Sequence, residues 1–222
     1  MDQLWASVPL CRLQAAAPWR TFRWYRGQRH YSGTYWSSTV QDHVIYESRL
    51  ELARLLYADF DVHVRRIVAQ PFLLKTVVDG KIRKHVPDFL LMSRHGAVIV
   101  DVKPHSRRDD PAFRLTSGWT RELVEARGWR YELWSEPPAA ELANLRLLAG
   151  FRRAWLFNSH LLKALARAPL DGTPLGQAAR LLPDFPRPQV KAGIFHFLWT
   201  SHLVTDLLTP LGPTHTLRRP RE

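Results

Sequence analysis

Two apolar runs bounded by acidic residues constrain this chain more than any other feature of its sequence. Residues 89–92 and 97–100 are short and apolar, and four residues that include a glycine separate them. This pattern is typical of two buried strands joined by a tight turn. Such a turn places Asp88 opposite Asp101, with Cβ atoms about 4.5–5.5 Å apart. The sequence therefore predicts two carboxylates that face each other at one end of a hairpin.

A bound cation would explain this pair of carboxylates. Two facing carboxylates repel each other, and Mg²⁺ prefers one or two carboxylates together with water and phosphate oxygens. Lys103 follows Asp101 by two residues, so it is expected on the same face about 6.6 Å along the strand. Glu51, on a helix predicted upstream, would supply a third oxygen ligand.

These residues are the components of metal-assisted phosphodiester hydrolysis. A metal lowers the pKa of its bound water and neutralises charge in the transition state, and a second metal would stabilise the leaving 3′ oxygen. Lys103 could take part in proton transfer or act by electrostatic stabilisation alone. The alternative is that Asp88 caps a turn after Pro87 and that Asp101 forms a surface ion pair with Lys103. Because the adjoining runs are apolar, buried strand ends favour the chemical interpretation.

The charge of the chain indicates a polyanionic partner. The 222 residues include 32 Lys and Arg against 20 Asp and Glu, which gives a net charge of +12. Nucleic acid is the most common partner of such a chain, although a basic surface can also serve solubility. A hydrophobic content of 45% excludes a disordered chain, and the single cysteine excludes a disulfide framework. With no apolar run of membrane-spanning length and no signal peptide, we expect an intracellular soluble protein.

The predicted elements of the first 150 residues alternate between helices and strands. The order is helix, several strands, helix and strand, which indicates a mixed α/β sheet with helices against it. The helix at 42–57 is expected to begin near Thr39 and Asp42, with Glu47 and Glu51 on one side. The remaining predicted elements are strands at 64–69, 72–78, 81–86, 87–92, 97–103 and 129–134, and a helix at 111–127 that ends at Gly128.

The sequence after Gly150 predicts a small winged helix-turn-helix domain. Three helices are expected at 153–167, 174–182 and 186–201, followed by a hairpin at 203–209 and 214–219. Lys191 and His196 lie on the presumptive recognition helix. That helix also carries three large aromatic residues, so it could instead dock a protein.

The N-terminal residues 1–38 form a basic, aromatic arm. Two interpretations of the arm are open. It binds the phosphates of a nucleic acid and stacks on its bases, or it packs on the surface of the domain. The predicted domains are therefore the arm at 1–38, a catalytic domain at 39–150 and a winged helix at 151–222. The arm is rich in Arg and aromatic residues, including Trp19, Arg20, Phe22, Arg23, Trp24, Tyr25, Arg26, Arg29 and Tyr31.

The chain resembles a family of nucleases. The order of a Glu-bearing helix, a Pro-Asp strand and an Asp-x-Lys strand is similar to the PD-(D/E)xK nucleases of the restriction-endonuclease-like fold. More narrowly, several segments resemble the TnsA-type endonuclease subunit of heteromeric transposases, over about residues 20–150. These segments are Tyr46–Leu52, Gln70–Phe72, His85–Leu90, Val100–Pro104, Gly128–Tyr131 and Asn144–Arg146.

The resemblance implies a fold, a reaction and a set of partners. The fold is a restriction-endonuclease-like mixed sheet flanked by helices, followed by a small winged helix. The reaction is Mg²⁺-dependent cleavage of the 5′-end strand at transposon ends in double-stranded DNA, with Mn²⁺ as an alternative metal. The partners are an integrase-like transposase subunit and an ATPase regulator of transposition. The resemblance also implies that the protein lies in the bacterial cytoplasm, associated with the nucleoid and not with a membrane.

The same resemblance implies the roles of individual residues. Glu51, Asp88 and Asp101 would be the metal ligands, and Lys103 the catalytic lysine. The superfamily often has Glu, and some transposase subunits have Gln, where this chain has Asp101, so ligand geometry is expected to differ. A helix-surface role is expected for Glu47.

Two other functions remain open on the sequence. One is a stand-alone restriction or repair endonuclease, and the other is a non-catalytic DNA-binding adaptor. A zinc site is not expected, because His63, His85 and His95 fall on separate elements. The basic stretch His105–Arg108 could contact a phosphate or form a solvated loop.

Overall fold

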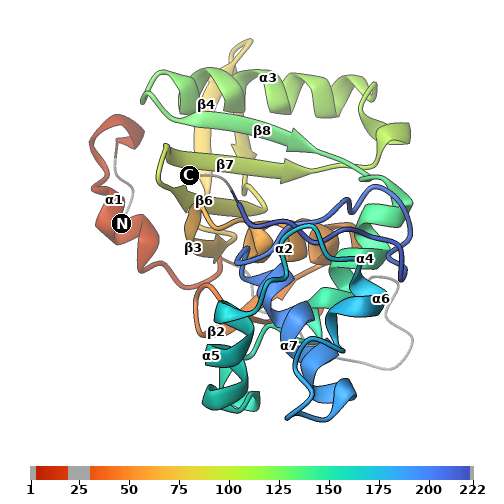
Figure 1. Cartoon of the computed structure of the whole chain (residues 1–222). Coiled ribbons are helices and arrows are strands. Elements are labelled where there is room, and N and C mark those ends of the chain that lie inside the picture. Colours follow the sequence, from red (N-terminus) through yellow and green to blue (C-terminus); the bar gives the residue numbers. More distant parts are fainter. Residues whose placement is uncertain (1–3, 20–30, 221–222) are drawn as a thin grey trace. The chain divides into compact units, whose positions relative to one another are not determined.

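The computed structural model describes residues 4–19 and 31–220 (Figure 1). The chain forms two compact units, Met1–Glu136 and Pro137–Glu222. The first unit contains a mixed four-stranded sheet flanked by helices, which confirms the predicted mixed α/β class. The second unit is mainly helical.

The central sheet of the first unit has the strand order β3-β6-β7-β8. The first two pairings are antiparallel, and the pairing of β7 with β8 is parallel. All four strands were predicted, and β6 and β7 supply the most fully buried residues, among them Phe89, Leu90, Ile99 and Val100. Their bounds are Val64–Ala69 for β3, Phe89–Ser93 for β6, Gly96–Val102 for β7 and Arg130–Trp134 for β8.

Two helices, α2 (Arg49–Phe60) and α3 (Pro111–Glu125), cover opposite faces of this sheet. Arg54 of α2 forms an ion pair with Glu132, with Nε and Oε1 2.9 Å apart. The guanidinium of Arg121 on α3 lies 5.1 Å from the ring centre of Tyr131. Because consecutive residues of a strand point to opposite faces, α2 and α3 lie on different sides of β8.

The prediction of a helix at 42–57 is wrong for its first residues. Residues Asp42–Tyr46 form strand β2, which pairs with β1 (Gly33–Ser37). The segment His-Val-Ile-Tyr is rich in β-branched and aromatic residues, which favour strands. The helix begins after Ser48, whose Oγ accepts a hydrogen bond from the Glu51 amide at 3.1 Å. The N-cap is therefore Ser48 in place of Thr39 or Asp42, and Glu47 precedes the helix.

The hairpin of β4 (Leu74–Val78) and β5 (Lys81–His85) confirms its predicted turn. Asp79 and Gly80 have φ angles of 51° and 71°, as the Asp-Gly signal requires. At the end of α3, Gly128 adopts a φ of 72° as predicted, although the helix ends at Glu125.

The first part of the N-terminal arm packs on the first unit. It contains the short helices η1 (Trp5–Ser7) and α1 (Leu10–Gln14). The indole Nε1 of Trp5 donates to the Leu123 carbonyl at 2.7 Å, and Arg127 donates to the Trp5 carbonyl at 2.6 Å. This part of the arm follows the packed interpretation. Most of the Arg and aromatic residues of the arm, from Arg20 to Arg29, lie outside the described residues.

The second unit begins earlier than the predicted boundary at 150. Helix α4 belongs to this unit because Asn144 Nδ2 donates to the carbonyls of Leu207 and Thr209 at 2.9 and 2.7 Å. The helices of the unit are α4 (Ala139–Ala149), η3 (Ala154–Leu156), α5 (Ser159–Arg167), α6 (Leu175–Ala178) and α7 (Arg187–Trp199).

The predicted C-terminal hairpin is present only as single bridges. Val204 pairs with Arg218, and Pro174 pairs with Thr216. The intervening segment contains Pro210 and Pro213, which lack the N–H group that a continuous ladder needs. Helix α6 is also shorter than predicted and ends at Ala178.

The C-terminal half of α7 is buried, which corrects the role considered for His196. This residue is 5% exposed, and its Nδ1 donates to the Phe151 carbonyl at 2.8 Å. Burial lowers the pKa of His196. Phe195, Phe197 and Trp199 are buried as well, so they form core and not a docking surface. Lys191, nearer the start of the helix, is exposed.

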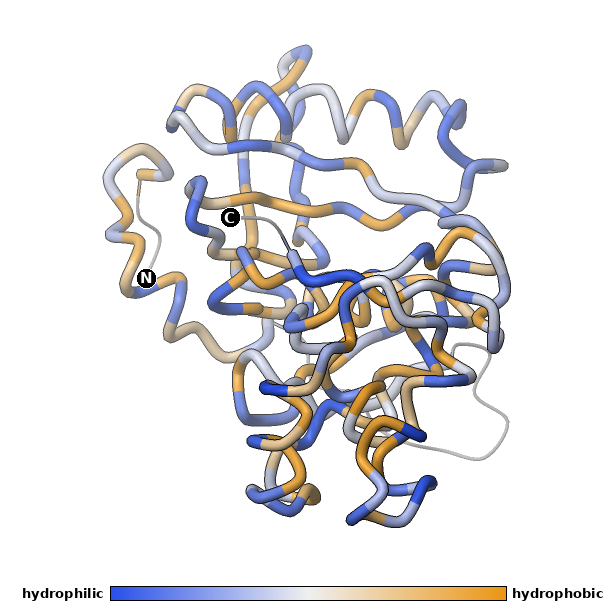
Figure 2. Tube along the Cα trace, viewed as in Figure 1, coloured by the Kyte–Doolittle hydropathy of each residue, from blue (hydrophilic) through white to orange (hydrophobic). Residues whose placement is uncertain are grey.

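Polar and apolar residues are interleaved along α3, and apolar residues continue along β7 (Figure 2). This distribution is that of a surface helix on a buried strand. Among the described residues, no helix has the length and apolar content to cross a membrane.

Candidate active site

Strands β6 and β7 adopt the predicted register. Met92 lies opposite Ala97 and Phe89 lies opposite Val100. Beyond the ladder, the Asp88 amide donates to the Val100 carbonyl at 3.1 Å and Asp88 Oδ2 accepts from the Val102 amide at 2.6 Å, so Asp88 contacts the residues on both sides of Asp101. Asp88 and Asp101 therefore meet at the end of the hairpin.

The carboxylates of Glu51 and Asp101 are close enough to Asp88 to perturb its ionisation. Burial raises the pKa of Asp88 well above its usual range, and the negative charges of Asp101 and Glu51 raise it further. Of the three acidic residues that the sequence predicts as ligands, Asp88 and Asp101 line one cleft. Glu51 does not line that cleft, although its charge contributes to the raised pKa of Asp88.

Glu51 is held at the start of α2 by its own helix cap. Its Oε2 accepts from the Glu47 amide at 2.7 Å, and its Oε1 accepts from the Ser48 hydroxyl at 2.9 Å. Burial raises the pKa of Glu51, while these two hydrogen bonds lower it. Glu47 lies before the helix, and its Oε1 accepts from Gln70 Nε2 at 2.7 Å. The predicted helix-surface role of Glu47 is therefore wrong, because its carboxylate lies near the site and also raises the pKa of Asp88.

Asp88 and Asp101 are held by different donors. Asp88 Oδ2 accepts from the Val102 amide at 2.6 Å, which fixes one carboxylate oxygen at the strand end. Asp101 is only 2% exposed. The Tyr131 hydroxyl donates to Asp101 Oδ2 at 2.6 Å, and His85 Nε2 lies 2.9 and 2.8 Å from the two Asp101 oxygens.

Sequence reasoning missed Tyr131 and set His85 aside. Burial and the charge of Asp101 raise the pKa of the Tyr131 hydroxyl, which therefore stays protonated and donates. Tyr131 is opposite Ile99 across the parallel β7–β8 pair, on the face that Asp101 also shares. A sequence signal did exist for His85, since it stands three residues before Asp88, at the end of a predicted strand.

Lys103 follows β7 and lines a cleft with the two aspartates. Its amide donates to the Trp134 carbonyl at 2.8 Å, which continues the β7–β8 pairing. Its ammonium nitrogen lies 4.7 Å from the ring centre of Phe113. The cleft has a volume of about 420 Å³ and runs between the end of β5 and the start of α3. Its lining residues are Lys84, His85, Asp88, Asp101, Val102, Lys103, Asp110, Ala112, Phe113 and Thr116.

The basic stretch after Lys103 is engaged with the protein. The His105 amide donates to Glu136 Oε2 at 2.8 Å, and Arg108 Nη2 donates to the Leu133 carbonyl at 2.8 Å. Arg108 thus holds the backbone of β8. Arg107 of this stretch is exposed.

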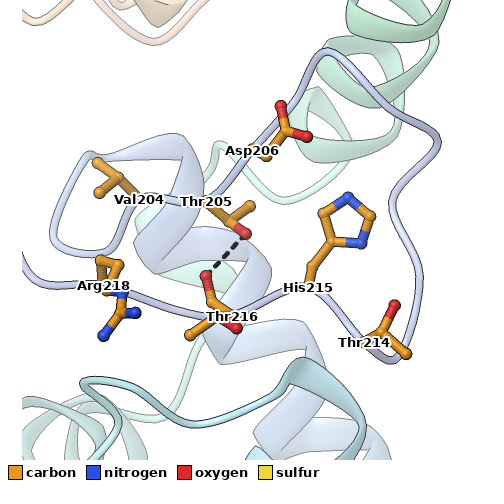
Figure 3. A pocket seen from close by; sticks show the side chains of 7 residues that line it. All are labelled: Val204, Thr205, Asp206, Thr214, His215, Thr216 and Arg218. Atoms are coloured by element: carbon orange, nitrogen blue, oxygen red, sulfur yellow. Dashed lines mark hydrogen bonds between the residues drawn. The ribbon is translucent and has the colours of Figure 1, made fainter.

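A second hollow, of about 490 Å³, lies in the second unit (Figure 3). Its polar groups serve local structure: Thr205 Oγ1 donates to the Thr216 carbonyl at 2.9 Å, and Asp206 accepts from the Leu208 amide at 2.8 Å. His215 Nδ1 accepts from the Gly212 amide at 3.0 Å. Although this hollow is larger, the candidate active site is the cleft that contains Asp88, Asp101 and Lys103, where acidic groups are buried together.

The donor atoms of the cleft suit a hard divalent cation. Asp88 and Asp101 present carboxylate oxygens to the cleft, and Mg²⁺ prefers such ligands. A cation would also relieve the negative charge that raises the pKa of Asp88. In the described residues, however, no three His, Cys, Asp or Glu side chains are already gathered to hold an ion. Glu51 would have to exchange its cap hydrogen bonds for a metal.

Replacement of Asp88 by asparagine is expected to stabilise the fold at neutral pH. Because the folded state raises the pKa of Asp88, the contribution of Asp88 to stability is present at low pH and is lost as the pH rises through the folded pKa. In EDTA at pH 8, Asp88→Asn should therefore raise the Tm by several degrees, and 1 kcal/mol corresponds to roughly 2–4 °C in a chain of this size.

The increase in Tm should shrink as the pH falls toward the usual range of an aspartic acid. Differential scanning calorimetry across this range checks the prediction. Asp109→Asn, at an exposed position, is the matched control and should leave the Tm unchanged. A lower Tm for Asp88→Asn at pH 8 would contradict the predicted cost of the ionised carboxylate.

Comparison with known proteins gave no family assignment. Neither a scan against protein-family models nor a search of curated proteins found a match to this chain. The residues and geometry of the cleft therefore carry the functional conclusion.

Proposed function

We propose that this chain is a metal-dependent DNA endonuclease, and that it cleaves the 5′-end strand at transposon ends as the TnsA-like subunit of a heteromeric transposase. The observation that carries the proposal is the cleft at one end of the β6–β7 hairpin, which Asp88, Asp101 and Lys103 line together. Buried like charges cost folding free energy. Their retention at the edge of a cleft is therefore best explained by chemistry.

The acidic residues would hold Mg²⁺, or alternatively Mn²⁺. A bound cation would lower the pKa of a water molecule and neutralise charge on the phosphate. Lys103 would place its ammonium against a phosphate oxygen, and its position over the Phe113 ring keeps the side chain in the cleft. The Val102 amide and the Tyr131 hydroxyl would orient the oxygens of Asp88 and Asp101.

The arrangement of elements supports the finer fold assignment. A Glu-bearing helix, two strands with acidic ends, a helix and a parallel strand follow the order of the restriction-endonuclease-like fold. In the second unit, the bridged residue Pro174 lies between α5 and α6, and the bridged residues Val204 and Thr216 follow α7, which is the order of a winged helix. The exposed start of α7, with Lys191, would then face DNA.

A cleavage assay tests the proposal. The full-length chain is incubated with DNA carrying labelled transposon ends, with and without the co-encoded transposase, in Mg²⁺ or EDTA. We expect Mg²⁺-dependent cuts in the 5′-end strand at the transposon ends. Cutting at specific sites unrelated to transposon ends would indicate a stand-alone restriction or repair enzyme. DNA binding without cleavage under every condition would overturn the endonuclease and leave a DNA-binding adaptor.

DNA binding should weaken steeply with salt. The net charge of +12 predicts contacts to several phosphates, and each neutralised phosphate contributes a slope of about −0.9 to the logarithm of affinity against the logarithm of salt concentration. Fluorescence anisotropy of a labelled duplex between 50 and 300 mM salt measures the slope. A slope near zero would show that the basic surface does not contact DNA.

A further inference from the structure

The outward face of the β4–β5 hairpin carries a basic pair followed by an apolar pair. Lys75 lies opposite Lys84, and Val77 lies opposite Ile82. Directly opposed residues share a face of a hairpin, and so do residues two apart along one strand. These four residues therefore form one surface, which we term the ribbon face.

The opposite side of the hairpin fixes which way the ribbon face points. Leu74 and Val78 alternate with the residues of the ribbon face and pack into the core of the first unit with Trp119 of α3. On the ribbon face, Val77 is 66% exposed and Ile82 is 72% exposed. Two β-branched apolar side chains this exposed, side by side on a strand pair, are unusual on a surface with no partner.

The ribbon face adjoins the candidate active site. Lys84 belongs to the ribbon face and also lines the cleft, and the next residue, His85, contacts Asp101. From this base the hairpin runs past α3, and its tip extends beyond that helix in Figure 1. A long substrate that enters the cleft therefore meets the ribbon face.

The charge of the hairpin selects the class of substrate. Lys75 and Lys84 place two exposed positive charges directly opposite each other on the ribbon face. Lys81 and Arg83 lie on the opposite face of the same hairpin, and Asp79 is the single acidic residue between Leu74 and His85. The ribbon face therefore has the charge that complements a polyanion.

We propose that the ribbon face is where duplex DNA lies as it enters the cleft. Lys75 and Lys84 contact backbone phosphates, and Val77 and Ile82 pack on the sugar and base edges of the adjoining groove. Two-stranded ribbons fit DNA grooves, and apolar side chains can wedge against base steps. The inference rests on the proposed endonuclease function, because that function places the scissile phosphate in the cleft. The DNA contact of the ribbon face itself does not require cleavage.

Binding measurements on full-length variants in EDTA test the ribbon face without requiring cleavage. In Lys75→Ala/Lys84→Ala, the salt slope should fall in magnitude by about 2, because two phosphate contacts are lost. In Val77→Ser/Ile82→Ser, the affinity for a labelled duplex should fall severalfold at an unchanged salt slope. Thermal unfolding checks that the variants are folded, which we expect because the replaced residues are exposed.

Two control variants match these changes. Arg65→Ala/Arg94→Ala removes two exposed positive charges near the β6–β7 turn, at the other end of the β6–β7 hairpin from Asp88 and Asp101. Val62→Ser replaces an apolar residue that is 53% exposed. Both controls should keep the wild-type slope and affinity.

Equal affinity and slope in wild type and both ribbon variants would overturn the inference. A ribbon variant that binds DNA normally but no longer binds the co-encoded transposase would also overturn it and assign the face to a protein partner. Failure of the proposed function gives a different result, namely a wild-type protein that binds DNA and does not cut it. The binding test of the ribbon face remains valid in that case.

Discussion

Asp88→Ala and Lys103→Ala are each expected to lower the rate of Mg²⁺-dependent DNA cleavage by about 10²–10³-fold or more, with DNA affinity near that of the wild type. Loss of one group that stabilises charge in a transition state typically has an effect of this size. Burial raises the pKa of Asp88, and the charges of Asp101 and Glu51 raise it further. Lys103 supplies a positive charge next to Asp88 in the cleft.

The two substitutions should leave binding intact because the ribbon face, where we propose that duplex DNA lies, includes neither residue. Asp88→Ala removes negative charge, so its affinity for DNA should if anything increase. The assay follows conversion of a labelled transposon-end duplex under single-turnover conditions, with anisotropy of the same duplex in EDTA. Asp109→Ala and Lys163→Ala, which alter exposed residues, control for charge. Wild-type cleavage by either Asp88→Ala or Lys103→Ala would show that the active site lies elsewhere.

The meeting of Asp88 and Asp101 could be predicted because it depends on local pairing. The flanking runs are apolar on both faces, so the short β6–β7 turn, and not burial, fixes their register. The same reasoning gave the Asp79-Gly80 hairpin. When only a few residues join two strands, those strands pair with each other, so their pairing can be predicted from the sequence.

The start of α2 shows how a helical spacing can mislead. Ile45 matches the spacing of the later leucines, which extended the predicted helix back to Asp42. The competing signal was Ser48 with Glu51 three residues later, a capping box that marks a helix start. The cap also explains why the conformation of Glu51 could not be predicted, because its carboxylate serves the helix end as well as the site.

The contacts of Asp101 with Tyr131 and His85 lie beyond local reasoning. Tyr131 reaches Asp101 across a parallel pair whose strands are separated by α3, and no turn fixes such a register. The position of α4 is similar. Its apolar residues would suit either unit, and the hydrogen bonds of Asn144 assign it to the second.

Tyr131→Phe is expected to weaken the affinity for Mg²⁺ by about 10–100-fold, the usual effect of losing a hydrogen bond to a metal ligand. The Tyr131 hydroxyl is 2.6 Å from Asp101 Oδ2 in a buried setting. Without it, the carboxylate can rotate toward His85 Nε2, which already lies 2.8 Å from the same oxygen. The Mg²⁺ concentration for half-maximal cleavage should therefore rise, while the rate at saturating Mg²⁺ recovers most of the wild-type value.

Tyr35→Phe provides a matched control for this change. The Tyr35 hydroxyl also donates to a buried aspartate, Asp59, at 2.8 Å, and Asp59 additionally accepts from Ser37, Ser38 and Thr39. Its loss should lower the Tm and leave the Mg²⁺ dependence unchanged. Calorimetric titration with Mg²⁺ measures the affinity independently of cleavage. Equal Mg²⁺ affinity in wild type and Tyr131→Phe would contradict the expectation that this hydrogen bond positions Asp101 as a metal ligand.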